Sequence, residues 1–178
     1  MSSASKIFLG LLLLLAPTIM WSQRRHDPLT NAEIDQLRDT AQEPDLRLKL
    51  YLQFARSRLA AVEQVRSDPK ITDRGAEIHV RLRDFAEVYD ELNDNIDTYV
   101  GRKADLRKIL RTIIEADSEF QARLRALKDS TEASKEEEQK YHFTLSEALD
   151  TVDSSVQDHR QLLTEQEEAA KHKKKSQT

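Results

Sequence analysis

The apolar residues of this chain recur at intervals of three and four, the spacing that places side chains on one face of an α-helix. The first regular stretch contains Ile78, Leu82, Phe85, Tyr89, Leu92, Ile96 and Tyr99. The second contains Leu106, Leu110, Ile113, Phe120, Leu124 and Leu127, with Asp117 at a position where the pattern expects an apolar side chain. Both stretches predict long amphipathic helices whose apolar face, here called the seam, is buried.

Two further helices are predicted before this region. Thr30 and Glu33 have the spacing of a capping box, which predicts a short helix over residues 31–42. Pro44 suits the first turn of a second helix, over residues 44–66.

A long last helix is predicted over residues 135–170. Ser134 and Glu137 form a second capping box at its start. Its apolar face carries Leu145, Leu149, Val152, Val156, His159 and Leu163.

The architecture depends on what the chain does near Gly101. Tyr99 and Leu106 are seven residues apart, so the heptad pattern continues across this glycine without a slip. One reading is therefore a continuous coiled-coil-like helix over residues 74–130 with antiparallel partner helices. We favour a reversal, because it gives helices of comparable length and because Lys103, at a seam position, suits a helix end. The predicted fold is all-α: an elongated antiparallel bundle of about four long helices plus a short N-terminal helix.

The N-terminal residues have the features of an export signal. Lys6 precedes an apolar run at residues 7–20, and the small Ser22 stands before Gln23. The run is shorter than the roughly 20 apolar residues that span a bilayer. We predict a signal peptide over residues 1–22 and a periplasmic or secreted protein; the alternative is an uncleaved N-terminal membrane anchor.

The rest of the chain divides into three predicted segments. Residues 23–30 are a linker, residues 31–170 form the helical bundle, and residues 171–178 are a basic disordered tail.

Composition removes several classes of chemistry. The 178 residues include 28 Lys and Arg, 32 Asp and Glu, 3 Gly and no Cys. Disulfides, Cys-ligated metals and glycine-rich phosphate loops are therefore excluded, and the sequence contains neither H-E-x-x-H nor G-x-S-x-G. We predict a protein that is not an enzyme, with no catalytic residue, no cofactor and no metal ligand.

The histidines are the first candidates for chemistry. They are His26, His79, His142, His159 and His172. His142 and His159 both fit the apolar face of the last helix, but 17 residues separate them, about 25 Å along a helix. Glu138 and His142 could supply two ligands from one face, yet a di-metal bundle uses repeated E-x-x-H pairs, which are missing after residue 22. We expect histidines on helix faces without metal; a metal-binding bundle is the less favoured alternative.

Asp117 interrupts the seam of its helix. A lone buried carboxylate is costly, and a perturbed one in a cleft is a candidate functional group. We expect a structural role, either at the edge of the seam or paired with a basic side chain that fixes the helix register.

Two basic segments, residues 102–108 and 171–175, are candidates for contact with anions. The chain is net negative and no aromatic residue is interleaved with these charges, so we expect no nucleic-acid binding. At most, we expect weak contact of the basic tail with an anionic envelope surface.

The predicted function is that of an exported, non-enzymatic helical protein of a bacterial envelope, a structural or protein–protein interaction module that acts through helix faces on a partner or on itself. No small-molecule substrate is expected. The tetrapeptide at residues 163–166, L-T-E-Q, is similar to the LTxxQ motif of a periplasmic chaperone family, and a chaperone that binds clients is the alternative. An exposed apolar concavity would favour the chaperone, and a fully packed seam the interaction module.

Overall fold

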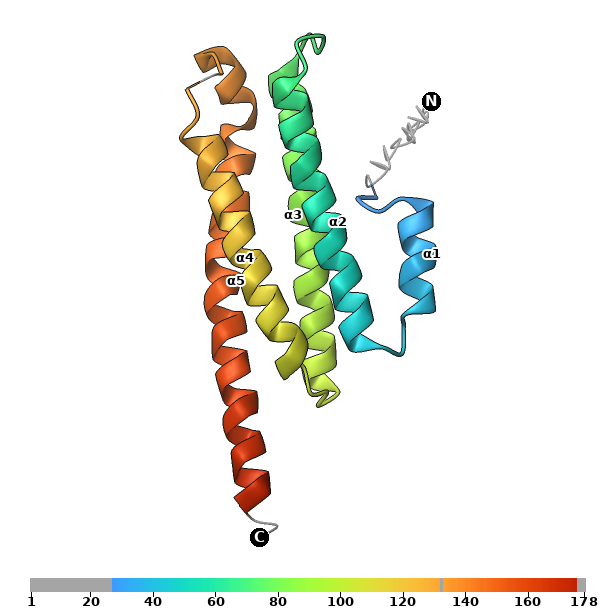
Figure 1. Cartoon of the computed structure of the whole chain (residues 1–178). Helices are drawn as coiled ribbons and strands as arrows, with labels where there is room; N and C mark the ends of the chain where they lie inside the picture. Colours follow the sequence, from blue (N-terminus) through green and yellow to red (C-terminus); the bar gives the residue numbers. More distant parts are fainter. Residues whose placement is uncertain (1–26, 132, 176–178) are drawn as a thin grey trace, which may run out of the picture.

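The computed structural model describes residues 27–131 and 133–175, which contain five helices and no strand (Figure 1). The helices are α1 (Asn31–Asp39), α2 (Pro44–Ser67), α3 (Arg74–Gly101), α4 (Arg107–Lys128) and α5 (Lys135–Lys175). None of them has the length and apolar character needed to span a membrane. The predicted signal peptide, residues 1–22, lies outside the described residues.

The four long helices form a bundle in which consecutive helices run antiparallel (Figure 1). Helix α2 packs against α3 and α4, and α5 packs against the same two helices. Helices α3 and α4 therefore lie diagonally opposite each other although they are consecutive in the chain. The predicted bundle is confirmed, and the alternative of one continuous helix over residues 74–130 is wrong.

The reversal after α3 begins two residues beyond its glycine. Gly101 is the last helical residue, and Lys103 has a left-handed backbone with φ of 59°. The amide of Lys103 donates to the carbonyl of Val100, and the amide of Ala104 donates to that of Tyr99. This pair of bonds is the Schellman arrangement, which ends a helix by reversing the backbone at one left-handed residue. Lysine instead of glycine occupies that residue here.

The predicted seams form the core of the bundle. All the apolar seam residues of α3 and α4 are buried, and three aromatic rings meet at the centre. The ring centroid of Phe120 lies 5.4 Å from that of Phe85 and 5.9 Å from that of Tyr89, both in edge-to-face geometry. The two diagonal helices thus meet through aromatic side chains, which bury large apolar areas.

Helix α1 packs outside the bundle, on α2 (Figure 1). The predicted capping box of Thr30 and Glu33 is present, and Leu37 is buried. The guanidinium of Arg58 donates to the Glu33 carboxylate at 2.7 Å, so the same acid caps α1 and ties it to α2. The helix ends at Asp39 instead of residue 42 as predicted.

Helix α5 differs from its prediction at both ends. Ser134 accepts a hydrogen bond from the amide of Glu137, as expected of its cap, but the Glu137 carboxylate accepts from Arg74 of α3. At the other end the helix continues to Lys175, so residues 171–175 are helical and the prediction of disorder there is wrong. No glycine or proline interrupts this segment, and lysines at a helix C-terminus interact favourably with the helix dipole.

Candidate functional site

A polar network lies in the middle of the bundle, around Asp117. This side chain is fully buried, with 0% of its surface exposed. The Tyr89 hydroxyl donates to one carboxylate oxygen at 2.8 Å, and Nδ1 of His159 lies 2.9 Å from the other. One residue each from α3, α4 and α5 is thereby joined, and both oxygens of the carboxylate have a partner.

Asp117 was expected either at the edge of the seam or paired with a basic side chain, and the structure decides between the two. A position at the edge of the seam is wrong, because the carboxylate is at the centre of the core. The expected pairing is found, with His159 as the titratable partner. Burying a carboxylate is costly unless it is hydrogen-bonded, and here two donors from two other helices meet that requirement.

Sequence reasoning placed Tyr89 in the seam as an apolar ring and missed its hydroxyl. A signal for the pair was present, because Tyr89 and Asp117 are each 14 residues from Lys103, where the chain reverses. In an antiparallel pair of helices, residues equally distant from the turn lie at the same level.

The network continues toward the surface through α3 and α5. The amide group of Asn93 donates to the Ser155 hydroxyl at 3.0 Å. Burial, followed by the charge and the hydrogen bond of Asp117, raises the pKa of Tyr89, and a hydrogen bond from Ser155 opposes this change. Tyr89 therefore remains a protonated donor to Asp117 at neutral pH.

A hollow of about 220 Å³ adjoins the network between α3 and α5. Asn93, Ser155 and His159 line it, together with the carboxylates of Asp97 and Asp158. His159 thus lies between the buried carboxylate and the solvent side of the bundle.

This arrangement resembles part of a hydrolase triad, in which aspartate orients histidine and histidine contacts a nucleophile. The described residues provide no hydrogen bond between His159 and the Ser155 hydroxyl, whose partners are Asn93 and Tyr89. Chemically, the arrangement orients an imidazole and joins three helices, and no serine hydroxyl in the described part of the chain is hydrogen-bonded to that imidazole. No group of three His, Asp or Glu side chains within the described ranges is placed to hold a metal ion.

The other histidines are scattered. Nδ1 of His79 lies 2.8 Å from the Thr144 hydroxyl, which links α3 to α5. His142 is exposed, so its predicted place on the buried face of α5 is wrong, and Tyr141 and Leu145 occupy that face. His172 is exposed on the last turns of α5, and Glu138, the other proposed ligand beside His142, is exposed as well. His26 lies outside the described residues.

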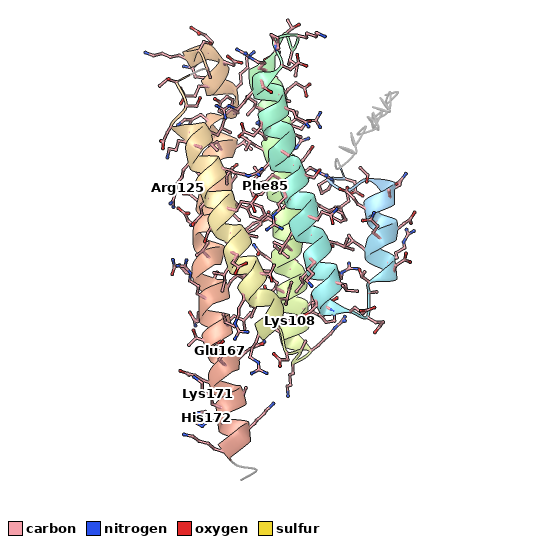
Figure 2. The ribbon with its side chains drawn as sticks, viewed as in Figure 1. Phe85, Lys108, Arg125, Glu167, Lys171 and His172 are labelled. Atoms are coloured by element: carbon pink, nitrogen blue, oxygen red, sulfur yellow. The ribbon has the colours of Figure 1, made fainter. Side chains whose placement is uncertain are left out.

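The two basic segments found in the sequence lie at the same end of the bundle. Gln166 of α5 accepts from the amide of Leu106 at 2.8 Å and donates to the carbonyl of Ala104, which fixes α5 against the α3–α4 turn. Residues 101–111 and 164–175, here called the basic end, carry nine Lys or Arg and four Asp or Glu. Figure 2 labels Lys108, Lys171 and His172 in this part of the molecule.

The opposite end of the bundle has more acidic than basic residues. Residues 66–77 and 129–140, here called the acidic end, carry five Lys or Arg and eight Asp or Glu. Charge is therefore segregated along the bundle axis, with the uncharged aromatic core and the Asp117 network between the two ends.

Comparison with known proteins gives no relative for this chain. No protein-family model, no curated protein and no solved structure matches it.

Proposed function

We propose that this chain is an exported, non-enzymatic helical protein of a bacterial envelope that works as a protein–protein interaction module. The packed seam supports a module of this kind over a chaperone. The predicted seam residues of α3 and α4 are buried, and the large apolar side chains exposed in the described part of the chain are Leu46 and Phe143. A chaperone that shields unfolded clients requires a larger apolar surface than two separated side chains.

The observation that carries the proposal is the position of Phe143. It lies on α5 with 72% of its surface exposed, whereas the other aromatic rings of α2 to α5 are buried. Its neighbour His142 and the following Glu147 are exposed as well, so the ring stands on a polar helix face. Aromatic side chains, Phe among them, are enriched in protein interfaces relative to the rest of the surface. The occupant of this face is a partner protein or a second copy of the chain.

The absence of catalysis is part of the proposal. The histidine of the Asp117 network is oriented by a carboxylate but has no nucleophile hydrogen-bonded to it among the described residues. The L-T-E-Q segment likewise has a structural explanation, because Gln166 joins α5 to the α3–α4 turn.

Site-specific cross-linking tests the contact face. A photoreactive phenylalanine analogue replaces Phe143 in cells that naturally make the protein, and a matched variant carries it at Leu46, which is 43% exposed on α2. We expect a discrete cross-linked product from position 143 and much less from position 46. A product of twice the chain mass identifies self-association, and another mass identifies a partner. Equal products at both positions, or none at 143, would contradict the proposal; a smear of many masses would favour the chaperone.

Export rests on residues 1–22 and has its own test. The intact mass of protein recovered from cells should correspond to a chain that starts at or near Gln23. A full-length chain in the membrane fraction would favour the alternative of an N-terminal anchor.

A further inference from the structure

We propose that the basic end of the bundle docks on an anionic membrane surface through lipid headgroups. The inference rests on the proposed function only in placing the protein at a cell envelope. It adds a second contact surface, at a different part of the molecule from Phe143.

The first support is that the C-terminal cations are held in a defined position. Helix α5 projects beyond the α3–α4 turn at its C-terminal end (Figure 1). Where it passes the turn, α5 is fixed by the two Gln166 hydrogen bonds and by an ion pair of 2.6 Å between Arg111 and Glu167. Lys171, Lys173 and Lys175 therefore extend from a continuous helix whose base is attached to the bundle.

The second support is that the turn adds its own cations to those of α5. A hollow of about 330 Å³ between the turn and α5 is bordered by Lys103, Arg107 and Lys173. Asp105 accepts two hydrogen bonds from the Arg107 guanidinium, which lowers the pKa of Asp105 to about 2, so this pair is neutral overall. The excess positive charge near the turn therefore comes from cations other than Arg107.

The third support is that several of these cations are exposed and lack an acidic partner. Lys103, Lys108, Lys171 and Lys175 are exposed, and no Asp or Glu of the described ranges forms an ion pair with them. At the acidic end, by contrast, Arg74 is paired with Glu137 and Lys140 with Asp73. The charge asymmetry therefore determines which end approaches a negative surface.

The fourth support concerns the kind of anion. Proteins that bind single-stranded nucleic acid combine cations with aromatic side chains on which bases stack. Residues 101–111 and 164–175 contain no Phe, Tyr or Trp. Cations spread over the end of a rod, without a stacking surface, match the diffuse negative charge of a headgroup layer, where each Lys contributes roughly fivefold in affinity.

Vesicle sedimentation tests this surface with the chain that begins at Gln23. Binding to vesicles of phosphatidylglycerol and phosphatidylcholine is compared with binding to phosphatidylcholine alone, at low and at moderate salt. We expect binding to the anionic vesicles only, and weaker binding as salt screens the charges. The double variant Lys108→Gln, Lys171→Gln should bind about 25-fold more weakly, from roughly fivefold for each Lys.

The matched control removes the same charge from exposed lysines outside the basic end, Lys128→Gln with Lys135→Gln, and should bind like the parent. Equal losses in both double variants, or equal binding to both kinds of vesicle, would overturn the proposal. Binding of an oligonucleotide duplex as tight as that of the anionic vesicles at the same salt would also overturn it. The Phe143→Ser variant should retain vesicle binding, and the Lys108→Gln, Lys171→Gln variant should retain cross-linking at position 143, so that each proposal fails separately.

Discussion

The two ends of the bundle are built from the same kinds of charged residue but use them differently. At the acidic end the charges join helices: Arg74 bonds Glu137 across α3 and α5, and Lys140 bonds Asp73 in the other direction. At the basic end the uncharged side chain of Gln166 makes the hydrogen bonds between α5 and the α3–α4 turn, and one ion pair joins Arg111 of α4 to Glu167 of α5. Exposed lysines lie around these contacts.

The packing of the backbone around the glycines also differs between the two ends. At the acidic end α3 approaches α5 so closely that a Cβ added to Gly75 would lie 2.6 Å from the backbone oxygen of Glu137. At the basic end a Cβ added to Gly101 would meet no atom within 4 Å. The backbones of α3 and α5 are therefore in close contact at the acidic end, whereas exposed lysines without an acidic partner among the described residues are found at the basic end.

The largest effect on stability is expected midway between the two ends, in the Asp117 network. Asp117→Leu should lower the free energy of unfolding by about 3–5 kcal/mol, because it leaves Tyr89 and His159 buried without their partner. Urea melts measure the loss. Glu115→Leu, the same change on the exposed face of α4, is the control and should stay within about 0.5 kcal/mol of the parent. A neutral Asp117→Leu would mean that the network adds no stability.

The glycines test the difference in packing. Gly75→Ala should cost about 1–3 kcal/mol, since the backbone of α5 must move to admit the methyl group. Gly101→Ala should instead stabilise by about 0.5–1 kcal/mol, because the helix gains alanine's propensity and the new methyl group has room. Thermal melts of both variants measure these changes, and effects of the same sign would contradict the difference in packing at the two glycines.

Lys103 tests the strain of the reversal at the basic end. Lys103→Gly should stabilise the protein by about 1 kcal/mol, because glycine adopts the left-handed backbone without steric cost. Denaturant melts measure the gain, and Lys108→Gly, within helix α4, should destabilise by a similar amount and serves as the control. A destabilised Lys103→Gly variant would show that the lysine side chain stabilises the turn more than its backbone strains it.

The smallest expected effect is the pH response of the acidic end. The hydrogen bond from Arg74 lowers the pKa of Glu137 below its usual value of 4.5. Its contribution is therefore complete above that value and is lost as the pH falls through the lowered pKa of the folded state. Glu137→Gln should be less stable than the parent at neutral pH, by no more than about 1 kcal/mol for a partly exposed pair. The difference should close in acid, as measured by urea melts across pH; a constant difference would assign the effect to packing.

Much of this fold could be predicted from the sequence, because the spacing of apolar residues determines which faces are buried. The seam residues of α3 and α4 are all buried, and Thr30 and Pro44 stand at the predicted helix starts. The exact stop of α3 was harder to predict. Gly101 was the expected breaker, yet an open helical glycine is tolerated, and the reversal depends on a left-handed lysine that residue preferences disfavour.

The candidate site was less accessible to sequence reasoning. Asp117 stood out as a polar residue in a seam, and His159 as a histidine on an apolar face. Their contact could not be inferred from either helix alone, because it depends on which helices are neighbours and on the level at which they meet. The prediction that His142 fits the buried face of α5 was wrong for a similar reason. A small rotation of α5 brings Tyr141 to the core and leaves the adjacent histidine outside.

We expect α3 and α5 to stay packed together at the acidic end while the basic end contacts the membrane surface. Hydrogen–deuterium exchange of the chain that begins at Gln23, with and without anionic vesicles, tests it most directly. Exchange should be slow in residues 74–80 and 137–145 under both conditions, and vesicle-induced slowing should be confined to residues 101–111 and 164–175. Slowing at the acidic end, or unchanged exchange at the basic end when the protein is bound to vesicles, would contradict it.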